Sequence, residues 1–193
     1  MKKNVTERPS VQALEAELHR VKYRSRYNTV MKSTVFTLIT VAAVAVLVAT
    51  LWLPVLQIYG SSMTPTLQDG EIIFSMKTDK MEPGDIIAFY YNNKILIKRV
   101  IAKPGDWVDL AEDGTVYIND AELIEPYIEE KSFGDANIQF PYQVPDGKIF
   151  VMGDHRATSA DSRHVEVGCV GPDQIVGKVM FRVWPLKQIG IIE

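Results

Sequence analysis

The hydrophobic pattern divides the chain into one long apolar run and a following region of short alternating segments. Residues 33–56 contain no Lys, Arg, Asp, Glu or His. About 20 helical residues cross the hydrocarbon core of a bilayer, so this run is long enough to span one. A buried core helix would carry a polar stripe, and the apolar part of a removable targeting sequence is shorter and closer to the N-terminus. The run therefore predicts a single transmembrane anchor over 33–56.

A second apolar pattern precedes this anchor. Four aliphatic residues recur at spacings of three and four, namely Val11, Leu14, Leu18 and Val21. This spacing predicts an amphipathic helix over residues 9–22. The stripe is too short for a sustained coiled coil, and both a helix lying beside the membrane and a partner-binding helix fit it.

After the anchor, β-branched and aromatic segments alternate with turn residues. The segments read EIIFSM, DIIAFYY, KILIKRVIA, WVDLA, TVYIN, KIFVMG and VGKVMFRVW. Asp113-Gly114 is a strong hairpin signal, and Asn92-Asn93 is a second candidate turn. Because no sustained helical periodicity follows residue 60, we expect a mainly β domain with antiparallel sheets.

This domain is expected to cover residues 57–193. Acids, proline and glycine are more frequent over 119–147, where strand signals are weaker. We therefore expect a smaller excursion from the sheet, within about residues 104–147.

Charge predicts the orientation of the anchor. Residues 1–32 carry eight Lys or Arg and three Glu, whereas the remainder carries 13 basic and 21 acidic residues. Basic residues close to a membrane span stay on the cytoplasmic side; here they are Arg20, Lys22, Arg24, Arg26 and Lys32. We therefore expect a single-pass cell-membrane protein, with residues 1–32 in the cytoplasm and residues 57–193 outside it.

Several common chemical motifs are absent from the sequence. It has no GxSxG elbow, HExxH, CxxC or glycine-rich phosphate loop. Cys169 is the single cysteine, so no intrachain disulfide can form, and its GCVG context favours a small buried side chain. We expect no metal, no organic cofactor and no nucleic-acid partner.

The stretch GSSMTPT at 60–66 offers two serines that could act as nucleophiles, and a serine needs a nearby base. His155 beside Asp154 would suggest a Ser-His-Asp triad. Lys98 is the other candidate, because its strand-like run ILIKRV is apolar on both faces. Burial lowers a lysine pKa, and a fall of about three units corresponds to roughly 4 kcal/mol. An edge-strand or snorkelling lysine remains an alternative.

Four blocks, taken in order, carry a family resemblance. They are SSMTPTL at 61–67, GDIIAF at 84–89, KRVIAKPGD at 98–106 and GDHRATSADSR at 153–163. Together with the preceding anchor they closely resemble the type I signal peptidases. The resemblance implies a signal-peptidase-type β domain and a membrane-bound serine endopeptidase with a Ser-Lys dyad. Such an enzyme works beside membrane phospholipid and removes signal peptides from exported preproteins.

The resemblance also assigns roles to individual residues. The serine before Met falls on Ser62 as the nucleophile, and the lysine that opens the third block falls on Lys98 as the general base. In the fourth block Ser159 would hydrogen-bond the lysine, while Asp161 and Arg163 would hold the loop.

The sequence departs from the family pattern at two places. Some members have a serine two residues before the nucleophile, where its hydroxyl helps to bind the oxyanion, and here that position is Gly60. The fourth block reads GDHRATS where many members read GDNRDNS, so the substitutions are His155, Ala157 and Thr158. The second oxyanion donor is therefore left open.

Substrate preference follows from the same resemblance. Signal peptides end in small residues of the A-x-A kind, so the site should offer shallow apolar pockets and an edge strand for an extended peptide. Ile58, Met63 and Ile97 are the candidate wall residues, although core packing would equally explain them. Two alternatives stay open: a dedicated peptidase of the same dyad type for pilin-like substrates, and a non-catalytic, membrane-tethered module that binds signal peptides.

Overall fold

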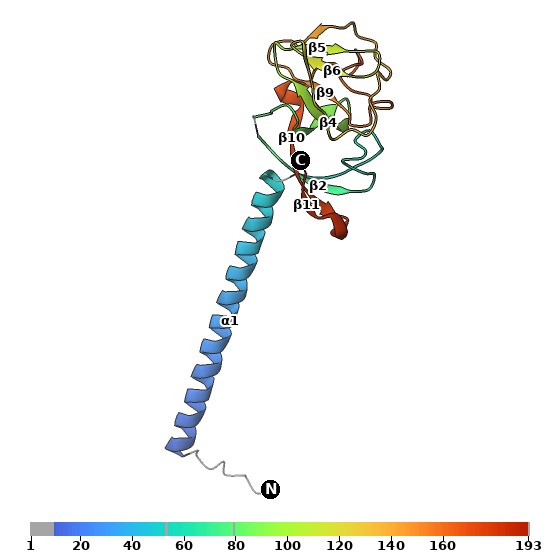
Figure 1. Ribbon diagram of the computed structural model, residues 1–193. Helices are drawn as coiled ribbons and strands as arrows, with labels where there is room; N and C mark the ends of the chain where they lie inside the picture. The colour runs from blue at the N-terminus through green and yellow to red at the C-terminus, as the bar shows by residue number, and fades with distance from the viewer. Residues whose placement is uncertain (1–9, 53, 79, 193) are drawn as a thin grey trace. The chain divides into compact units, whose positions relative to one another are not determined.

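The computed structural model describes residues 10–52, 54–78 and 80–192 (Figure 1). It divides into two units, one up to Val48 and one from Ala49 onward. Over the described residues, the first unit is part of a single long helix, and the second contains the β-strands.

The helix α1 runs from Val11 to Trp52. Ser10 caps its N-terminus, because its side-chain oxygen accepts a hydrogen bond from the backbone N–H of Ala13 at 3.3 Å. Three threonine hydroxyls donate to carbonyls four residues earlier, which satisfies them inside the helix; they belong to Thr29, Thr37 and Thr40. The expected helix over 9–22 and most of the apolar run thus form one continuous element.

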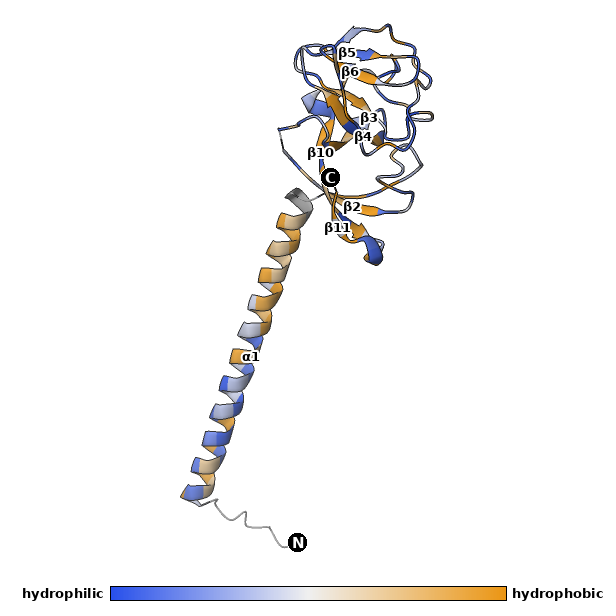
Figure 2. Cartoon of the chain, viewed as in Figure 1, coloured by the Kyte–Doolittle hydropathy of each residue, from blue (hydrophilic) through white to orange (hydrophobic). Residues whose placement is uncertain are grey.

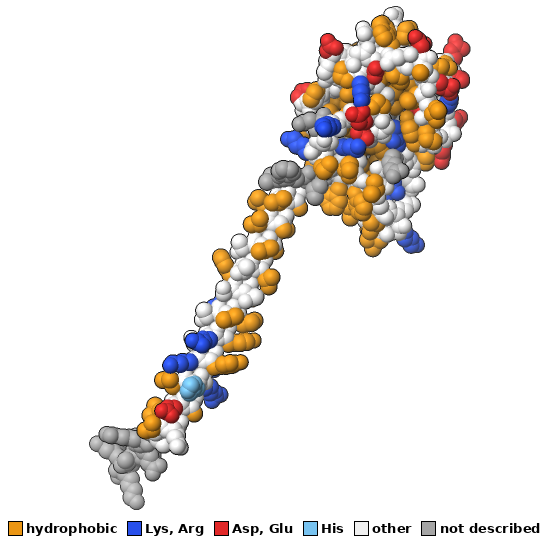
Figure 3. All heavy atoms as spheres, turned by 60° about the vertical axis from the view of Figure 1, so that its left-hand side comes forward, with side chains coloured by type: hydrophobic (Ala, Val, Ile, Leu, Met, Phe, Trp, Pro, Cys, Tyr) orange, Lys and Arg blue, Asp and Glu red, His pale blue; other side chains and the backbone are white. Residues whose placement is uncertain are grey.

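Within the described residues, α1 is the one helix that is long and apolar enough to cross a membrane, over Val11–Ala49. Figure 2 shows polar residues toward its N-terminal end and apolar residues over the rest. The Lys and Arg side chains of α1 gather toward the same end of the helix in Figure 3. The apolar run expected to form one anchor over 33–56 is divided, because the helix ends at Trp52 and Val55 and Leu56 enter a strand.

The second unit is a β domain, residues 55–191, with two antiparallel sheets. The larger sheet has seven strands, in the order β1 (Val55–Gln57), β2 (Ile72–Met76), β10 (Ile175–Trp184), β3 (Ile86–Tyr91), β4 (Lys94–Ala102) and β9 (Phe150–Met152), with β11 (Gly190–Ile191) paired to β10. The smaller sheet has the order β7 (Ala121–Glu122), β6 (Val116–Ile118), β5 (Trp107–Leu110) and β8 (Tyr142–Gln143). The mainly antiparallel β fold expected from the sequence is confirmed.

Both predicted turns close hairpins. Asn92 adopts a positive φ of 50° between β3 and β4, whose residues Tyr91 and Lys94 are partners in the ladder. Gly114 adopts a φ of 87° between β5 and β6. Positive φ is the conformation in which glycine and asparagine are most readily tolerated, which explains these residue types.

Three apolar clusters form the core of the β domain. One lies between the sheets and includes Phe150, Met152 and Cys169, which is buried as its context predicts. A second contains Ile58, Met63, Leu67, Ile73, Ile86 and Val179. A third packs on the other side of β3 and β4 and includes Phe89, Val100 and Val151. Two 3-10 turns, Pro172–Gln174 and Leu186–Gln188, flank β10.

Candidate active site

The segment after β1 forms a sharp turn that presents Ser62. Gly60 adopts a φ of +87°, and its N–H donates to Asp69 Oδ1 at 2.7 Å. Farther along, the N–H of Leu67 donates to the carbonyl of Met63 at 2.8 Å, and both side chains are buried. The apolar side chains anchor the turn in the core, while Ser62 remains half-buried at its surface.

Lys98 comes from the middle of β4 and meets this serine. Its Nζ lies 2.9 Å from Ser62 Oγ and donates to the carbonyl of Ile97 at 2.9 Å. The residue is only 2% exposed. Burial lowers the Lys98 pKa to about 8, although the carboxylates of Asp161 and Asp154 oppose this effect. With a pKa of about 8, about a tenth of the Lys98 side chains are neutral at pH 7. This neutral amine is in direct contact with the Ser62 hydroxyl.

Arg99 points to the opposite face of β4, as period-two alternation requires. Its Nε and Nη2 donate to the two carboxylate oxygens of Asp154 at 3.0 and 2.8 Å, and its Nη1 donates to the carbonyl of Gly84 at 2.7 Å. The face of the Tyr127 ring lies 3.9 Å from the guanidinium carbon. Both cations of ILIKRV are therefore buried, and they have different partners.

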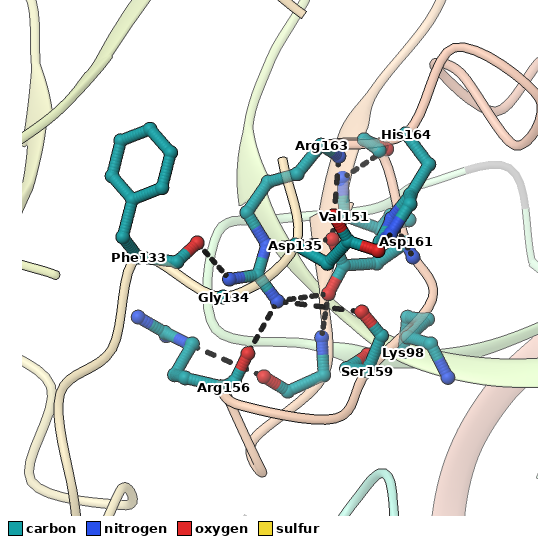
Figure 4. Close-up of polar contacts among 12 residues, drawn as sticks. Lys98, Phe133, Gly134, Asp135, Val151, Arg156, Ser159, Asp161, Arg163 and His164 are labelled. Carbon is teal, nitrogen blue, oxygen red and sulfur yellow. Dashed lines mark hydrogen bonds and ion pairs between the residues drawn. The ribbon is translucent and has the colours of Figure 1, made fainter. Parts of the chain in front are cut away.

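Asp161 and Arg163 form an ion pair, with both side chains fully buried, behind Lys98 (Figure 4). Asp161 Oδ2 accepts the N–H of Gly153 at 3.0 Å. The Arg163 guanidinium donates to the carbonyls of Phe133 and Arg156, each at 2.8 Å. These bonds connect the two ends of the loop over 153–163 and fasten it to a segment 30 residues earlier.

Ser159 is buried in the same loop and is drawn beside Lys98 in Figure 4. Its hydroxyl makes no hydrogen bond to any described residue, so the expected bond from Ser159 to Lys98 is not formed in this structure. The lysine instead donates to Ser62 and to the Ile97 carbonyl. A Cβ on Gly153 would lie 2.1 Å from Ser159 Oγ and 2.5 Å from the Ser62 carbonyl oxygen, so glycine permits this close packing.

The histidine alternative is not assembled. The His155 ring nitrogen Nδ1 lies 2.8 Å from the hydroxyl of Thr158. The carboxylate of Asp154 is occupied by Arg99 and by the hydroxyl of Thr66. His155 contacts the nucleophile segment through its backbone, because its N–H donates to the Ser62 carbonyl at 3.1 Å.

A cavity of about 600 Å³ opens beside Ser62 and Lys98. The three predicted wall residues, Ile58, Met63 and Ile97, all line it. Ile58 and Met63 also belong to the buried core, and Ile97 packs against them, so core packing accounts for these residues as well as a position on the cavity wall does. The remaining lining residues are Leu56, Gln57, Tyr59, Gly60, Asn93, Lys94, Ile95 and Leu96.

One edge of β4 is open at this cavity. Strand β3 pairs with β4 from Lys94 to Arg99, whereas β9 pairs only with residues from Arg99 onward. Among the described residues, no strand pairs with the second edge of 94–98. The backbone N–H of Ser62 also donates no hydrogen bond to a described residue.

Several neighbours of the site were missed by sequence reasoning. Glu125 and Tyr127 lie in the excursion, which carries weak patterns, and nothing in their spacing indicated that they reach Arg156 and Arg99. Thr66 could have been suspected, since it lies inside the SSMTPTL block and donates to Asp154.

The chain is similar to a protein family and to several of its members. Residues 31–184 match the family model described as signal peptidase, peptidase S26. Signal peptidase IB of Staphylococcus aureus strain Mu50 is 39% identical over 152 residues, which cover 68% of this chain and 78% of the relative. Signal peptidase I of Streptococcus pneumoniae serotype 4 is 34% identical over 173 residues, with coverage of 69% and 83%.

A crystal structure of a signal peptidase I from Enterococcus faecalis V583 superposes with a TM-score of 0.45 at 30% sequence identity, covering 53% of this chain and 98% of that one. Because the family model spans well over half of the residues, the chain belongs to the signal peptidase family, peptidase S26.

Proposed function

We propose that this protein is a membrane-anchored serine endopeptidase that removes signal peptides from exported preproteins, with Ser62 as nucleophile and Lys98 as general base. The observation that carries the proposal is the 2.9 Å contact between Ser62 Oγ and the buried Lys98 Nζ. A lysine with a lowered pKa beside a hydroxyl is the arrangement that activates a serine without histidine.

The proposed reaction begins with the neutral form of Lys98. As Ser62 Oγ attacks the substrate carbonyl, Lys98 Nζ takes the hydroxyl proton and becomes an ammonium. The negative charge that develops on the carbonyl oxygen is stabilised by the free N–H of Ser62. The N–H of Gly60 is already donated to Asp69 Oδ1, so it does not supply the second donor.

The second half of the reaction uses the same lysine as an acid and then as a base. The Lys98 ammonium protonates the leaving amine, which breaks the peptide bond and leaves an acyl group on Ser62. A water molecule then attacks the acyl carbon and gives a proton to Lys98. The Lys98 ammonium returns this proton to Ser62 Oγ as the bond between Oγ and the acyl carbon breaks, so the acid product leaves and the serine hydroxyl is restored. Asp161 and Arg163 support these steps by holding the loop behind Lys98.

The substrate is bound as an extended strand in this proposal. The open edge of β4 at 94–98 can form main-chain hydrogen bonds with a peptide that lies in the cavity. Ile58, Met63 and Ile97 give the cavity an apolar wall close to Ser62. Such a wall fits the small residues of an A-x-A site at the end of a signal peptide.

The basic residues before the anchor support an orientation with the N-terminus in the cytoplasm and the β domain outside it. Ser62 lies ten positions after Trp52, the end of α1. At no more than about 3.5 Å per residue, the nucleophile lies within about 35 Å of the end of the helix. This reach matches a cleavage site that follows a membrane-inserted apolar segment.

The test is cleavage of a purified preprotein with an A-x-A site by the full chain, in detergent with phospholipid. Ser62→Ala and Lys98→Ala should be inactive, whereas the matched controls Ser61→Ala and Lys80→Ala should cut at the signal-peptide boundary. His155→Ala should also cut. Activity of Lys98→Ala, or loss of activity in His155→Ala with the fold intact, would overturn the proposed base, and an inactive wild type would indicate a dedicated substrate or a binding role.

A further inference from the structure

Two side chains of the excursion reach the charged residues behind the active site. Tyr127 lies with its ring 3.9 Å from the guanidinium carbon of Arg99. The Glu125 side chain is only 1% exposed and forms an ion pair with the fully buried side chain of Arg156. Both residues come from the segment between β7 and β8.

Tyr127 covers the ion pair between Asp154 and Arg99, which lies on β4 next to Lys98. Arg99 is bound on its edge by both oxygens of Asp154 and by the carbonyl of Gly84. The aromatic ring lies over the remaining flat face of the guanidinium, which is a favourable cation–π arrangement. The ring thereby keeps water away from a buried charge pair whose cation is adjacent to Lys98 in the sequence.

Tyr127 also holds the anchor of the loop over 153–163. Its hydroxyl donates to Glu125 Oε1 at 2.7 Å, and Arg156 Nη1 donates to Glu125 Oε2 at 2.7 Å. Burial and the adjacent Glu125 carboxylate raise the pKa of the Tyr127 phenol, so it stays neutral and keeps donating.

From Arg156 the contacts continue to the site. Its Nε donates to the carbonyl of Gly153 at 3.1 Å, and its own carbonyl accepts Arg163 Nη2. Gly153 in turn packs against Ser159 and against the Ser62 carbonyl. A continuous set of contacts therefore runs from the excursion to the nucleophile.

We propose that Tyr127 is a positioning residue for catalysis, which excludes water from the Arg99–Asp154 pair and holds the loop over 153–163 against Lys98. The proposal rests on the proposed function, because it requires Lys98 to act as the general base. Tyr127 acts through Arg99 and Glu125 and touches neither the substrate nor the reacting atoms.

The charged groups around Lys98 set the direction of the expected effect. Asp154 and Asp161 favour its ammonium form, and burial together with Arg163 disfavours it; Arg99, on the same strand, neutralises Asp154. If the ring of Tyr127 is removed, water reaches the Arg99–Asp154 pair and loosens it. Beside a less compensated Asp154, the ammonium form of Lys98 is favoured and its pKa is higher.

The experiment compares the pH profiles of kcat/KM for the full-length wild type and Tyr127→Leu between pH 6 and 10, on the preprotein substrate. The acid limb reports the pKa of the essential base in the free enzyme. For Tyr127→Leu we expect this limb to move up by about one pH unit, with an activity loss of about tenfold at pH 7 that largely disappears at pH 10. Tyr127→Phe keeps the ring over Arg99 and should restore most of the wild-type limb.

Tyr90→Leu is the matched control, because Tyr90 is 55% exposed on β3 and should give the wild-type profile. An acid limb unchanged in Tyr127→Leu, or an equal loss at every pH, would reject the positioning role. If Tyr127→Leu does not fold, Tyr127→Met, which has a long apolar side chain without an aromatic face, takes its place in the same comparison. Lys98→Ala, measured in parallel, separates the two proposals, since its activity would overturn the proposed function itself.

Discussion

Replacing Lys98 with methionine is expected to stabilise the β domain at neutral pH while abolishing activity. Lys98 is buried, and burial is the largest cause of its lowered pKa. Methionine has a similar length and no charge to desolvate, and it fills irregular apolar space well. The gain in stability should therefore depend on pH, because the desolvation penalty exists only while Lys98 is charged.

The magnitude follows from the pKa. A fall from 10.5 to about 8 means that the folded state disfavours the ammonium. At roughly 1.4 kcal/mol per pKa unit, this penalty is about 3 kcal/mol. Methionine also leaves Ser62 Oγ and the Ile97 carbonyl without their donor, which offsets about 1 kcal/mol. The net gain near pH 7 is then about 2 kcal/mol, or a rise in Tm of about 4 to 8 °C for a domain of this size.

The sign of the pH dependence is fixed by linkage. Below pH 8 the lysine is charged in both the folded and the unfolded state, so wild type carries the full penalty. Between pH 8 and 10.5 the folded state releases its proton first, and wild type gains stability relative to the variant. Above 10.5 the advantage of methionine is gone.

The assay is thermal unfolding of wild type and Lys98→Met in the same detergent, from pH 7 to 10.5. Lys80→Met, at an exposed lysine, controls for the general effect of losing a charge. A difference in Tm that stays constant across this pH range, or a wild type that is more stable at pH 7, would refute the argument that Lys98 is held against a desolvation penalty.

Two further substitutions test the loop behind the site. Gly153→Ala should lower kcat/KM by about a hundredfold, because its Cβ would fall between Ser159 Oγ and the Ser62 carbonyl; Gly190→Ala, where no atom lies within 4 Å, should retain activity in the same cleavage assay. Asp161→Asn should lower the free energy of unfolding by about 3 kcal/mol, since it leaves the buried Arg163 without its charge partner. The control is Asp135→Asn, at a side chain that is 96% exposed. Equal free energies of unfolding in urea for the two variants would contradict this prediction.

The parts of the fold that depend on local signals were predictable. The alternation in KILIKRVIA and the two hairpin turns identify β3, β4, β5 and β6, because a turn and a two-residue period are properties of neighbouring residues. Strands β7 and β8 were missed, since each has only two residues and cannot display an alternating pattern. The apolar run over 33–56 gave no sign that α1 ends at Trp52 and that β1 begins at Val55, because Val55 and Leu56 are as apolar in a strand as in a membrane helix.

The site was predictable only in part. Apolar residues on the two faces of the strand predict that at least one of its two cations faces an apolar side, and in the structure both Lys98 and Arg99 are buried. Which cation meets Ser62 depends on a contact across 36 residues, and local periodicity carries no information on such a contact. The contact between Tyr127 and Arg99 is of the same long-range kind. The bond expected from Ser159 to Lys98 was wrong for this structure, since proximity of a buried hydroxyl does not determine its hydrogen-bond partner.

Burial is the main cause of the low Lys98 pKa, and the positive charge of Arg163 adds to it. Two carboxylates, Asp154 and Asp161, act to raise that pKa, and unpaired they would hold the lysine in its charged form. Arg99 binds both oxygens of the first, and Arg163 binds both oxygens of the second. Arginine keeps its positive charge and forms two parallel bonds to a carboxylate, so a fixed cation lies against each of the two carboxylates. Lysine at either arginine position would keep the positive charge but lose the second bond, so the carboxylate would be held less firmly. We therefore expect Arg99→Lys and Arg163→Lys to raise the Lys98 pKa, measured as an acid limb of kcat/KM that moves to higher pH.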